Sequence, residues 1–135
     1  PMSSHEMIHP PGWDPPKGYS NGVLAAPGGR LLFVAGQVAW SAEQTIVCED
    51  FPGQFRQALS NVVDVVRTAG GAPEHLTRLT IYVTDRNAYL DNLRDVGAAY
   101  REVMGRHFPA MALVQVAALI ETGAQIEIEG TAVLP

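Results

Sequence analysis

A chain of 135 residues, of which 47% are hydrophobic and 17% charged, has the size and composition of a single folded domain. Its formal charge of −5 argues against a general nucleic-acid binder, because proteins that hold the phosphate backbone concentrate lysine and arginine. The single cysteine, Cys48, rules out an internal disulfide and fits a reducing cytoplasm. Since the sequence has no run of about 18 apolar residues and no signal-peptide pattern, we expect a cytoplasmic protein that does not enter a membrane.

The N-terminal part of the chain is punctuated by proline. Residues 9–20, HPPGWDPPKGYS, contain four prolines and two glycines, which exclude a helix or a central strand. We therefore expect an extended arm over residues 1–18, followed by one domain over residues 19–135.

Two apolar runs follow this arm, near residues 22–26 and 30–38. Because the Pro27-Gly28-Gly29 segment between them has the composition of a turn, the pattern predicts a β-hairpin. A short strand is also expected at residues 45–48.

The next segment carries the signals of a helix that starts after Asp50 and ends before Gly70. Asp50 can accept the cap hydrogen bond, and Pro52 falls in the first turn, where its missing N–H costs nothing. The apolar residues recur at spacings of three and four, so they form one stripe that can cover a sheet. These residues are Phe55, Ala58, Leu59, Val62, Val63, Val66 and Ala69.

The second half of the chain predicts a strand, a helix and two more strands. RLTIYVTD, residues 78–85, alternates in the manner of a strand, and a turn at 85–87 leads into a helix over about 88–104. The stretch from Phe108 to Pro135 reads as two strands joined by a turn. One sheet with two helices and hairpin-linked strands indicates an α+β fold.

Two glutamates alternate with isoleucines in the last predicted strand. Because successive side chains point to opposite faces, Glu127 and Glu129 share one face while Ile126 and Ile128 share the other. If helices cover the isoleucine face, the glutamates lie either on a solvated face or in a subunit interface.

The preceding strand favours the interface, since it is too apolar to face water. One of two alternating sets lies on the glutamate face: either Leu113, Gln115 and Ala117, or Ala112, Val114 and Val116. A carboxylate in a partly dry crevice is a candidate general base or water-orienting group.

Other sites of chemistry are not indicated. The APGGR segment leads into no helix, so it is not a phosphate-binding loop. His5 and His9 have i,i+4 spacing but lie beside prolines, and we expect no metal site. Acidic Glu49 and Asp50 should raise the pKa of Cys48, which argues against a nucleophilic thiol.

Taken in order, these segments resemble the RidA family, also called YjgF or reactive intermediate deaminases. The resemblance runs from GYSNGV through LLFVAGQVA, QFRQALSNVVDVVRTAG, LTRLTIYVTD, FPAMALVQVAAL and IEIEGTAV. It implies a chorismate-mutase-like single domain, in which two helices cover a mixed sheet, and a homotrimer with clefts between subunits. It also implies the hydrolysis of enamines or imines to ketoacids and ammonia without a metal or organic cofactor.

The resemblance further implies which residues form the site. Tyr19 corresponds to a tyrosine that lines the cleft, and Glu127 to the glutamate that positions the attacking water. Gly36 and Gln37 correspond to the backbone at a strand end that borders the substrate.

Three positions depart from the family pattern. Met111 stands where deaminating members have an arginine, whose fork of donors grips the substrate carboxylate; a thioether cannot neutralise an anion. Leu113 stands where cysteine is frequent, and Gly97 where asparagine is frequent. The site is therefore less polar, and we expect that simple amino-acid-derived imines are not its preferred substrates.

An enlarged cleft is one way to accommodate these changes. Trp13 and Trp40 are either ordinary packing residues or walls of a cleft for a ring-derived or unsaturated acid, such as an aminomuconate-like enamine. Four arginines are candidates to replace the missing cation from a neighbouring subunit: Arg30, Arg56, Arg78 and Arg101.

The leading interpretation is a cofactor-free hydrolase in which Glu127 holds water, Tyr19 shapes the pocket and backbone groups near Gly36 polarise the substrate. A non-catalytic small-molecule binder or regulatory partner is the alternative, which Met111 favours. A ribonuclease, an activity attached to some relatives, fits least, because the chain is acidic and has no histidine pair in a basic groove.

Overall fold

The structure is a computed structural model that describes residues 5–135; the first four residues of the expected arm lie outside this range. Its elements, in chain order, are β1 (Glu6–Ile8), β2 (Gly22–Leu24), β3 (Arg30–Gln37), α1 (Phe51–Thr68), the 3₁₀ turn η1 (Pro73–His75), β4 (Leu76–Val83), α2 (Arg86–Leu90), α3 (Leu93–Met104), β5 (Ala110–Gln115) and β6 (Ile126–Leu134).

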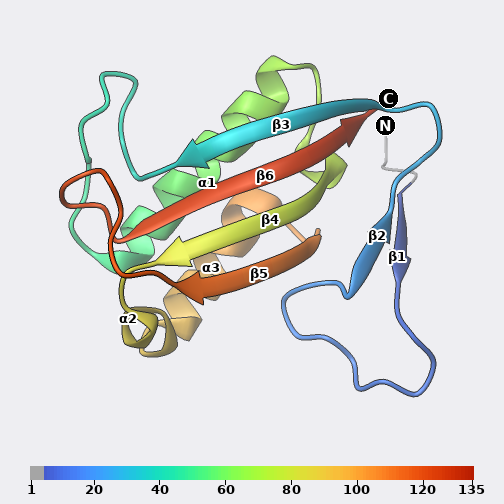
Figure 1. Ribbon diagram of the computed structural model, residues 1–135, viewed down its shortest axis with the longest axis horizontal. Helices are drawn as coiled ribbons and strands as arrows, with labels where there is room; N and C mark the ends of the chain where they lie inside the picture. Colours follow the sequence, from blue (N-terminus) through green and yellow to red (C-terminus); the bar gives the residue numbers. More distant parts are fainter. Residues whose placement is uncertain (1–4) are drawn as a thin grey trace.

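A four-stranded mixed sheet with the order β3-β6-β4-β5 forms the centre of the molecule. Strand β6 runs antiparallel to both neighbours, whereas β4 and β5 run parallel. Helices α1 and α3 lie across one face of this sheet, and no helix or strand in residues 5–135 covers the other face, which is bare in this sense (Figure 1). The arrangement is an α+β fold, as predicted.

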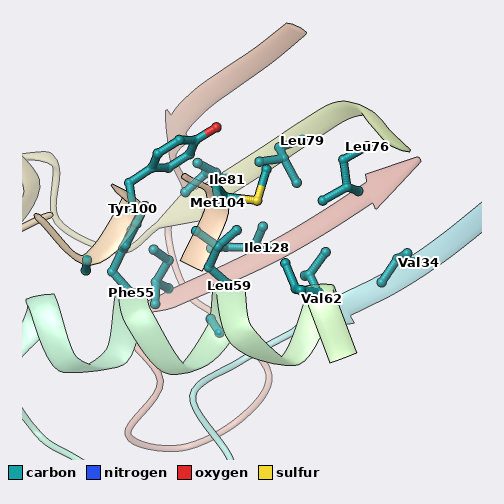
Figure 2. Close-up of a cluster of buried hydrophobic side chains, with 14 of the residues drawn as sticks. Val34, Phe55, Leu59, Val62, Leu76, Leu79, Ile81, Tyr100, Met104 and Ile128 are labelled. Carbon is teal, nitrogen blue, oxygen red and sulfur yellow. The ribbon is translucent and has the colours of Figure 1, made fainter. Parts of the chain in front are cut away.

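The core lies between this sheet and the two helices, as Figure 2 shows. Leu59 and Val62 of α1 face Leu79 of β4 and Ile128 of β6, and Met104 of α3 joins the same cluster. All five side chains are buried. Burial of one such side chain contributes about 1.5–3 kcal/mol, so this layer holds the sheet in place beneath the helices.

The predicted hairpin between residues 22–26 and 30–38 is wrong. The chain does turn between these segments, and Gly28 adopts a φ of 74° there. Strand β2, however, pairs with β1, while β3 pairs with β6 from Arg30 opposite Leu134 onward. The nine-residue β6 offers β3 a longer ladder than the three-residue β2 could.

The C-terminal hairpin is also wrong, although both of its strands exist. Strand β4 lies between β5 and β6, so the two are not neighbours. Residues 9–20 form no helix and no ladder strand, as predicted, but β1 precedes them within the expected arm. Of the strand expected at 45–48, only an isolated bridge between Ile46 and Trp40 is present.

The first helix matches its prediction, and the second is divided. Asp50 caps α1 by accepting a hydrogen bond from the Gly53 N–H at 2.9 Å. The helix expected over 88–104 starts earlier, at Arg86 after the Asp85 cap, and is split at residues 91–92 into α2 and α3. No described helix is both long enough and apolar enough to cross a lipid bilayer.

Candidate functional site

Strand β6 separates its isoleucines from its glutamates as predicted. Ile126 and Ile128 are fully buried beneath the helices, and Glu127 and Glu129 are half-buried on the bare side of the sheet. We call this bare side the open face.

The register of the sheet decides which residues of β5 share the open face. Tyr82 of β4 lies opposite Glu127 on one side and Val114 on the other, so Val114 and Ala112 belong to the glutamate face. Leu113 is turned toward the helices. Two apolar side chains of β3 border the open face. Leu31 is 59% exposed and Phe33 is 73% exposed.

Glu127 lies directly against the backbone of Gly36. The β3–β6 register shifts between Val34 and Gln37, which places Gly36 in an irregular, bulged part of β3. A Cβ atom on Gly36 would overlap with Oε2 of Glu127 and lie 2.8 Å from its Cδ atom. Glycine therefore makes room for the carboxylate beside the main chain.

The two glutamates have different surroundings. The Tyr82 hydroxyl donates a hydrogen bond to Oε2 of Glu129 at 3.0 Å, and this bond, followed by burial, raises the pKa of Tyr82. No described residue donates a hydrogen bond to the Glu127 carboxylate. Glu127 thus keeps its acceptor sites open for water or a ligand.

Gln37 and Trp40 lie together near the end of β3. The indole Nε1 of Trp40 donates a hydrogen bond to Oε1 of Gln37 at 3.3 Å, and both line a shallow hollow beside Asn61 of α1. Trp13 is 61% exposed and belongs to neither this hollow nor the larger pocket described next.

A larger pocket, with a volume of about 520 Å³, opens on the helix side of the sheet. It brings together Tyr19 from the loop before β2, Gly97 from α3, and Met111 and Leu113 from β5. Such a volume is typical of small-molecule sites, which span roughly 300–1,000 Å³. Of the residues predicted to bind substrate, this pocket therefore joins three: Tyr19, Met111 and Leu113.

Aromatic residues that the sequence did not single out form one wall of this pocket. The rings of Tyr100 and Phe108 stack with their centroids 5.1 Å apart. The Tyr100 hydroxyl donates to the carbonyl of His107 at 2.6 Å, and burial raises the pKa of Tyr100, so the phenol stays neutral. In the sequence, only their positions could have pointed to the pocket: Tyr100 lies near the end of α3, and Phe108 lies just before β5.

The loop that carries Tyr19 is fastened to the start of β5. The Ser20 N–H donates to the carbonyl of Pro109 at 3.1 Å, and the Ser20 hydroxyl donates to the carbonyl of Phe108. Ser20 also forms an isolated parallel bridge with Ala110. The rim of the pocket is thereby held next to the strand that carries Met111.

The four arginines considered as replacements occupy different places. Arg56 forms an ion pair with Glu102 at 2.8 Å, and Arg30 donates to the main-chain oxygen of Pro135 at 3.1 Å. Arg78 lies on the open face near Glu129. Arg101, one turn after Gly97 on α3, lines the pocket, and so does Lys17, which the sequence did not single out.

Cys48 fits the expectation of an unreactive thiol. Burial, followed by the charge of Asp50, raises its pKa, so the thiolate is disfavoured. Within residues 5–135, no cluster of three or more histidine, cysteine, aspartate or glutamate side chains could hold a metal ion.

The predicted site residues therefore divide into two groups within one chain. Tyr19, Met111 and Leu113 line the pocket on the helix side. Glu127 and Gly36 meet on the open face, on the other side of the sheet. Gln37 and Trp40 lie near the second group at the end of β3.

Known proteins are similar to this chain in both sequence and fold. The family model described as endoribonuclease L-PSP matches residues 12–134. The 2-iminobutanoate/2-iminopropanoate deaminase of Salmonella typhimurium is 33% identical over 108 residues, which cover 78% of this chain and 80% of that protein.

Solved structures agree with this match. YyfB from Yersinia pestis, described as a Rid family protein of unknown function, is 35% identical and superposes with a TM-score of 0.84 over 96% of this chain and 98% of that one. TdcF from Escherichia coli, solved with bound serine, has a TM-score of 0.67 at 27% identity over 96% of this chain and 99% of that one. The chain thus belongs to the endoribonuclease L-PSP family, which is also the RidA or YjgF family.

Proposed function

We propose that this protein is a cofactor-free hydrolase that converts an imine or enamine of a carboxylic acid to the ketoacid and ammonia. The observation that carries the proposal is the Glu127 carboxylate, which lies against Gly36 without a hydrogen-bond donor among the described residues. A carboxylate held in this way can bind and orient a water molecule. A relative 33% identical, the Salmonella protein, is named for the deamination of 2-iminobutanoate and 2-iminopropanoate, which supports this reaction class.

The active cleft in this proposal lies between two copies of the chain. Glu127 and the pocket are on opposite sides of the sheet, so a neighbouring copy has to bring its own Glu127 to the pocket. The exposed Leu31 and Phe33 on the open face supply apolar area for such a contact. A chorismate-mutase-like homotrimer, with the open faces turned inward, satisfies both requirements.

The reaction needs one water molecule. The Glu127 carboxylate accepts a proton from this water as its oxygen attacks the carbon of the protonated imine, and a neutral carbinolamine forms. Glu127 then passes this proton to the nitrogen and takes the proton of the carbinolamine hydroxyl as the carbonyl forms and the C–N bond breaks. Ammonia and the ketoacid leave, and Glu127 returns the last proton to the solvent. An enamine first takes a proton from water at carbon, and backbone groups near Gly36 polarise the resulting imine.

The pocket supports a substrate larger than 2-iminopropanoate. Met111 and Leu113 give it an apolar floor, and its volume of about 520 Å³ has room for a ring-derived or unsaturated acid of the aminomuconate kind. We therefore place such acids ahead of the smallest imino acids.

Freshly generated imines test the proposal. An amino acid oxidase supplies them, and ammonia release is measured with and without this protein for a small imine and a bulky, aromatic one. We expect acceleration, with a preference for the bulky imine, and a trimer in light scattering. A monomer, or the absence of acceleration for every imine, would contradict the proposed cleft or the proposed reaction.

A second candidate function is a non-catalytic binder of small molecules. The neutral Met111 in the pocket favours it, because the pocket floor offers no charge to a reacting carboxylate. Ligand binding without ammonia release from any imine would identify this function.

A further inference from the structure

The pocket is positively charged although the protein is acidic. Among the residues that line it, only Lys17 and Arg101 are charged, whereas the whole chain has a formal charge of −5. Neither cation has an ion pair or a side-chain hydrogen bond with another described residue. Their charge is therefore available to a ligand.

The remaining walls are largely apolar. Tyr100 and Phe108 contribute stacked rings, and Leu93, Met111 and Leu113 contribute aliphatic and thioether surface. A ligand in this pocket has to bury an apolar body and to place an anionic group at the cationic side. Carboxylates with a bulky apolar body have this chemistry.

Arg101 lies over Gly97 on α3. The two residues are one helical turn apart, and a Cβ atom on Gly97 would lie 3.5 Å from Nη1 of Arg101. The backbone of Gly97 has no positive φ, so the helix does not need glycine at this position. A Cβ atom there would make only an ordinary contact with the guanidinium, which lies alongside position 97 at the pocket wall.

We propose that Arg101 binds the substrate carboxylate and that the pocket selects acids with a large apolar or aromatic body. The guanidinium offers paired donors that match a carboxylate, whereas Lys17 adds a point charge on the loop. The selected class, bulky imino acids, rests on the proposed function, because the reaction supplies the imino group. Binding of the carboxylate does not depend on the hydrolytic reaction, so it can be tested with compounds that do not react.

Three stable compounds separate charge from size. 3-Phenylpropanoate has both the charge and the body, 3-phenylpropanamide has the body alone, and propanoate has the charge alone. Calorimetric titration of the wild-type protein should give a Kd for 3-phenylpropanoate at least ~10-fold lower than for either of the other two. Equal affinity for the acid and its amide would overturn the proposal.

Two variants locate the charge. Arg101→Met should remove the preference for the acid over the amide while leaving amide binding in place. Arg94→Met removes the same charge from the same helix, and since Arg94 does not line the pocket, this variant should keep the preference. The proposal is overturned if Arg101→Met keeps the preference or if Arg94→Met loses it equally.

Turnover distinguishes this proposal from the proposed function. If no imine is hydrolysed but Arg101→Met abolishes the preference for the acid, the proposed reaction is wrong and the proposed role of Arg101 stands. If the wild type and Arg101→Met hydrolyse bulky imines with the same KM, the proposed reaction stands and the proposed role of Arg101 is wrong.

Discussion

The Glu127 carboxylate packs against Gly36, in the space that a side chain at position 36 would need. The carboxylate lies where the Cβ atom of any other residue at position 36 would stand. The bulge between Val34 and Gln37 brings the main chain of β3 to this point. Glu127 can therefore hold this position only because residue 36, on the adjacent strand, has no side chain.

Gly36→Ala should displace the Glu127 carboxylate, because the added methyl group overlaps with it. A shift of about 1 Å in a reacting group can cost ~100-fold in rate, and we expect a loss of this order in kcat/KM for a bulky imine. Gly22→Ala is the matched control, since its Cβ would meet only Ile8, at an ordinary contact of 3.5 Å. Full activity of Gly36→Ala would show that the carboxylate need not stay at this place.

Glu127→Gln should abolish turnover, because an amide cannot accept the proton of the attacking water. We expect a loss of at least ~100-fold in kcat, the range that general bases contribute. Glu129→Gln changes the neighbouring carboxylate on the same face and should keep most of the activity, since a glutamine oxygen can still accept the Tyr82 hydrogen bond. Light scattering should give the same mass for both variants, and equal activity in the two would refute the role of Glu127.

Stability should fall as the pH drops below about 6.5 because of His107. Burial lowers the pKa of this histidine, whose Nε2 lies 2.7 Å from the carbonyl oxygen of Leu76. The unfolded chain then binds a proton at a pH where the folded chain does not. The contribution of His107 is therefore complete above the unfolded pKa and declines as the pH falls toward the lower, folded value.

Urea denaturation at about pH 7.5 and about pH 5.5 measures this effect. The decrease in the free energy of unfolding between the two should be smaller in His107→Gln than in the wild type. An NMR titration gives the pKa of His107 directly, and a value at or above 6.5, the usual histidine value, would contradict the assignment.

Gln54→Leu should destabilise the fold by ~2–4 kcal/mol, since it leaves several buried polar groups without partners. Gln54 is 1% exposed and donates to the carbonyls of Cys48 and Gly123, both at 3.0 Å. It also accepts from the Gln125 N–H at 2.9 Å. The wild-type and variant free energies of unfolding in urea give the difference.

Gln57→Leu is the control for this substitution. Gln57 lies on the same helix, is only half-buried, and bonds to Asn61 alone at 2.9 Å. Its loss should cost much less, and an equal cost in the two variants would mean that burial of the amide is not the cause.

The helices were predictable because their signals are local. Asp50, Pro52 and Gly70 mark the ends of α1 in the sequence itself, and the apolar stripe follows from its periodicity. The second helix was misjudged only where Asp85 caps a separate short helix, α2, whose end at Leu90 has no glycine or proline to mark it.

Strand pairing was not predictable in the same way, because partners are chosen over long sequence distances. The turn composition at residues 27–29 suggested a hairpin, yet β3 pairs with a strand far along the chain, in which Leu134 lies opposite Arg30. The alternation in β6 still placed Glu127 and Ile128 on the correct faces, since alternation is local.

The candidate site was partly predictable. The sequence named Tyr19, Met111 and Leu113, and the fold collects them in one pocket. It did not indicate that Glu127 lies on the other side of the sheet, which depends on the register of β4, β5 and β6. Lys17 was missed because an exposed lysine in a proline-rich loop carries no signal of its own.

The hydrogen bonds of Ser20 to Phe108 and Pro109 hold the Tyr19 loop against the start of β5, so these two walls of the pocket keep a fixed relative position. The main chain that carries Tyr19 cannot move away from β5 unless the bonds from Ser20 to Phe108 and Pro109 break first. Ligands would then exchange through brief local unfolding of the loop rather than through a freely swinging lid. Exchange of the Ser20 amide hydrogen requires the same opening, so its rate sets a lower limit on how often the mouth of the pocket widens.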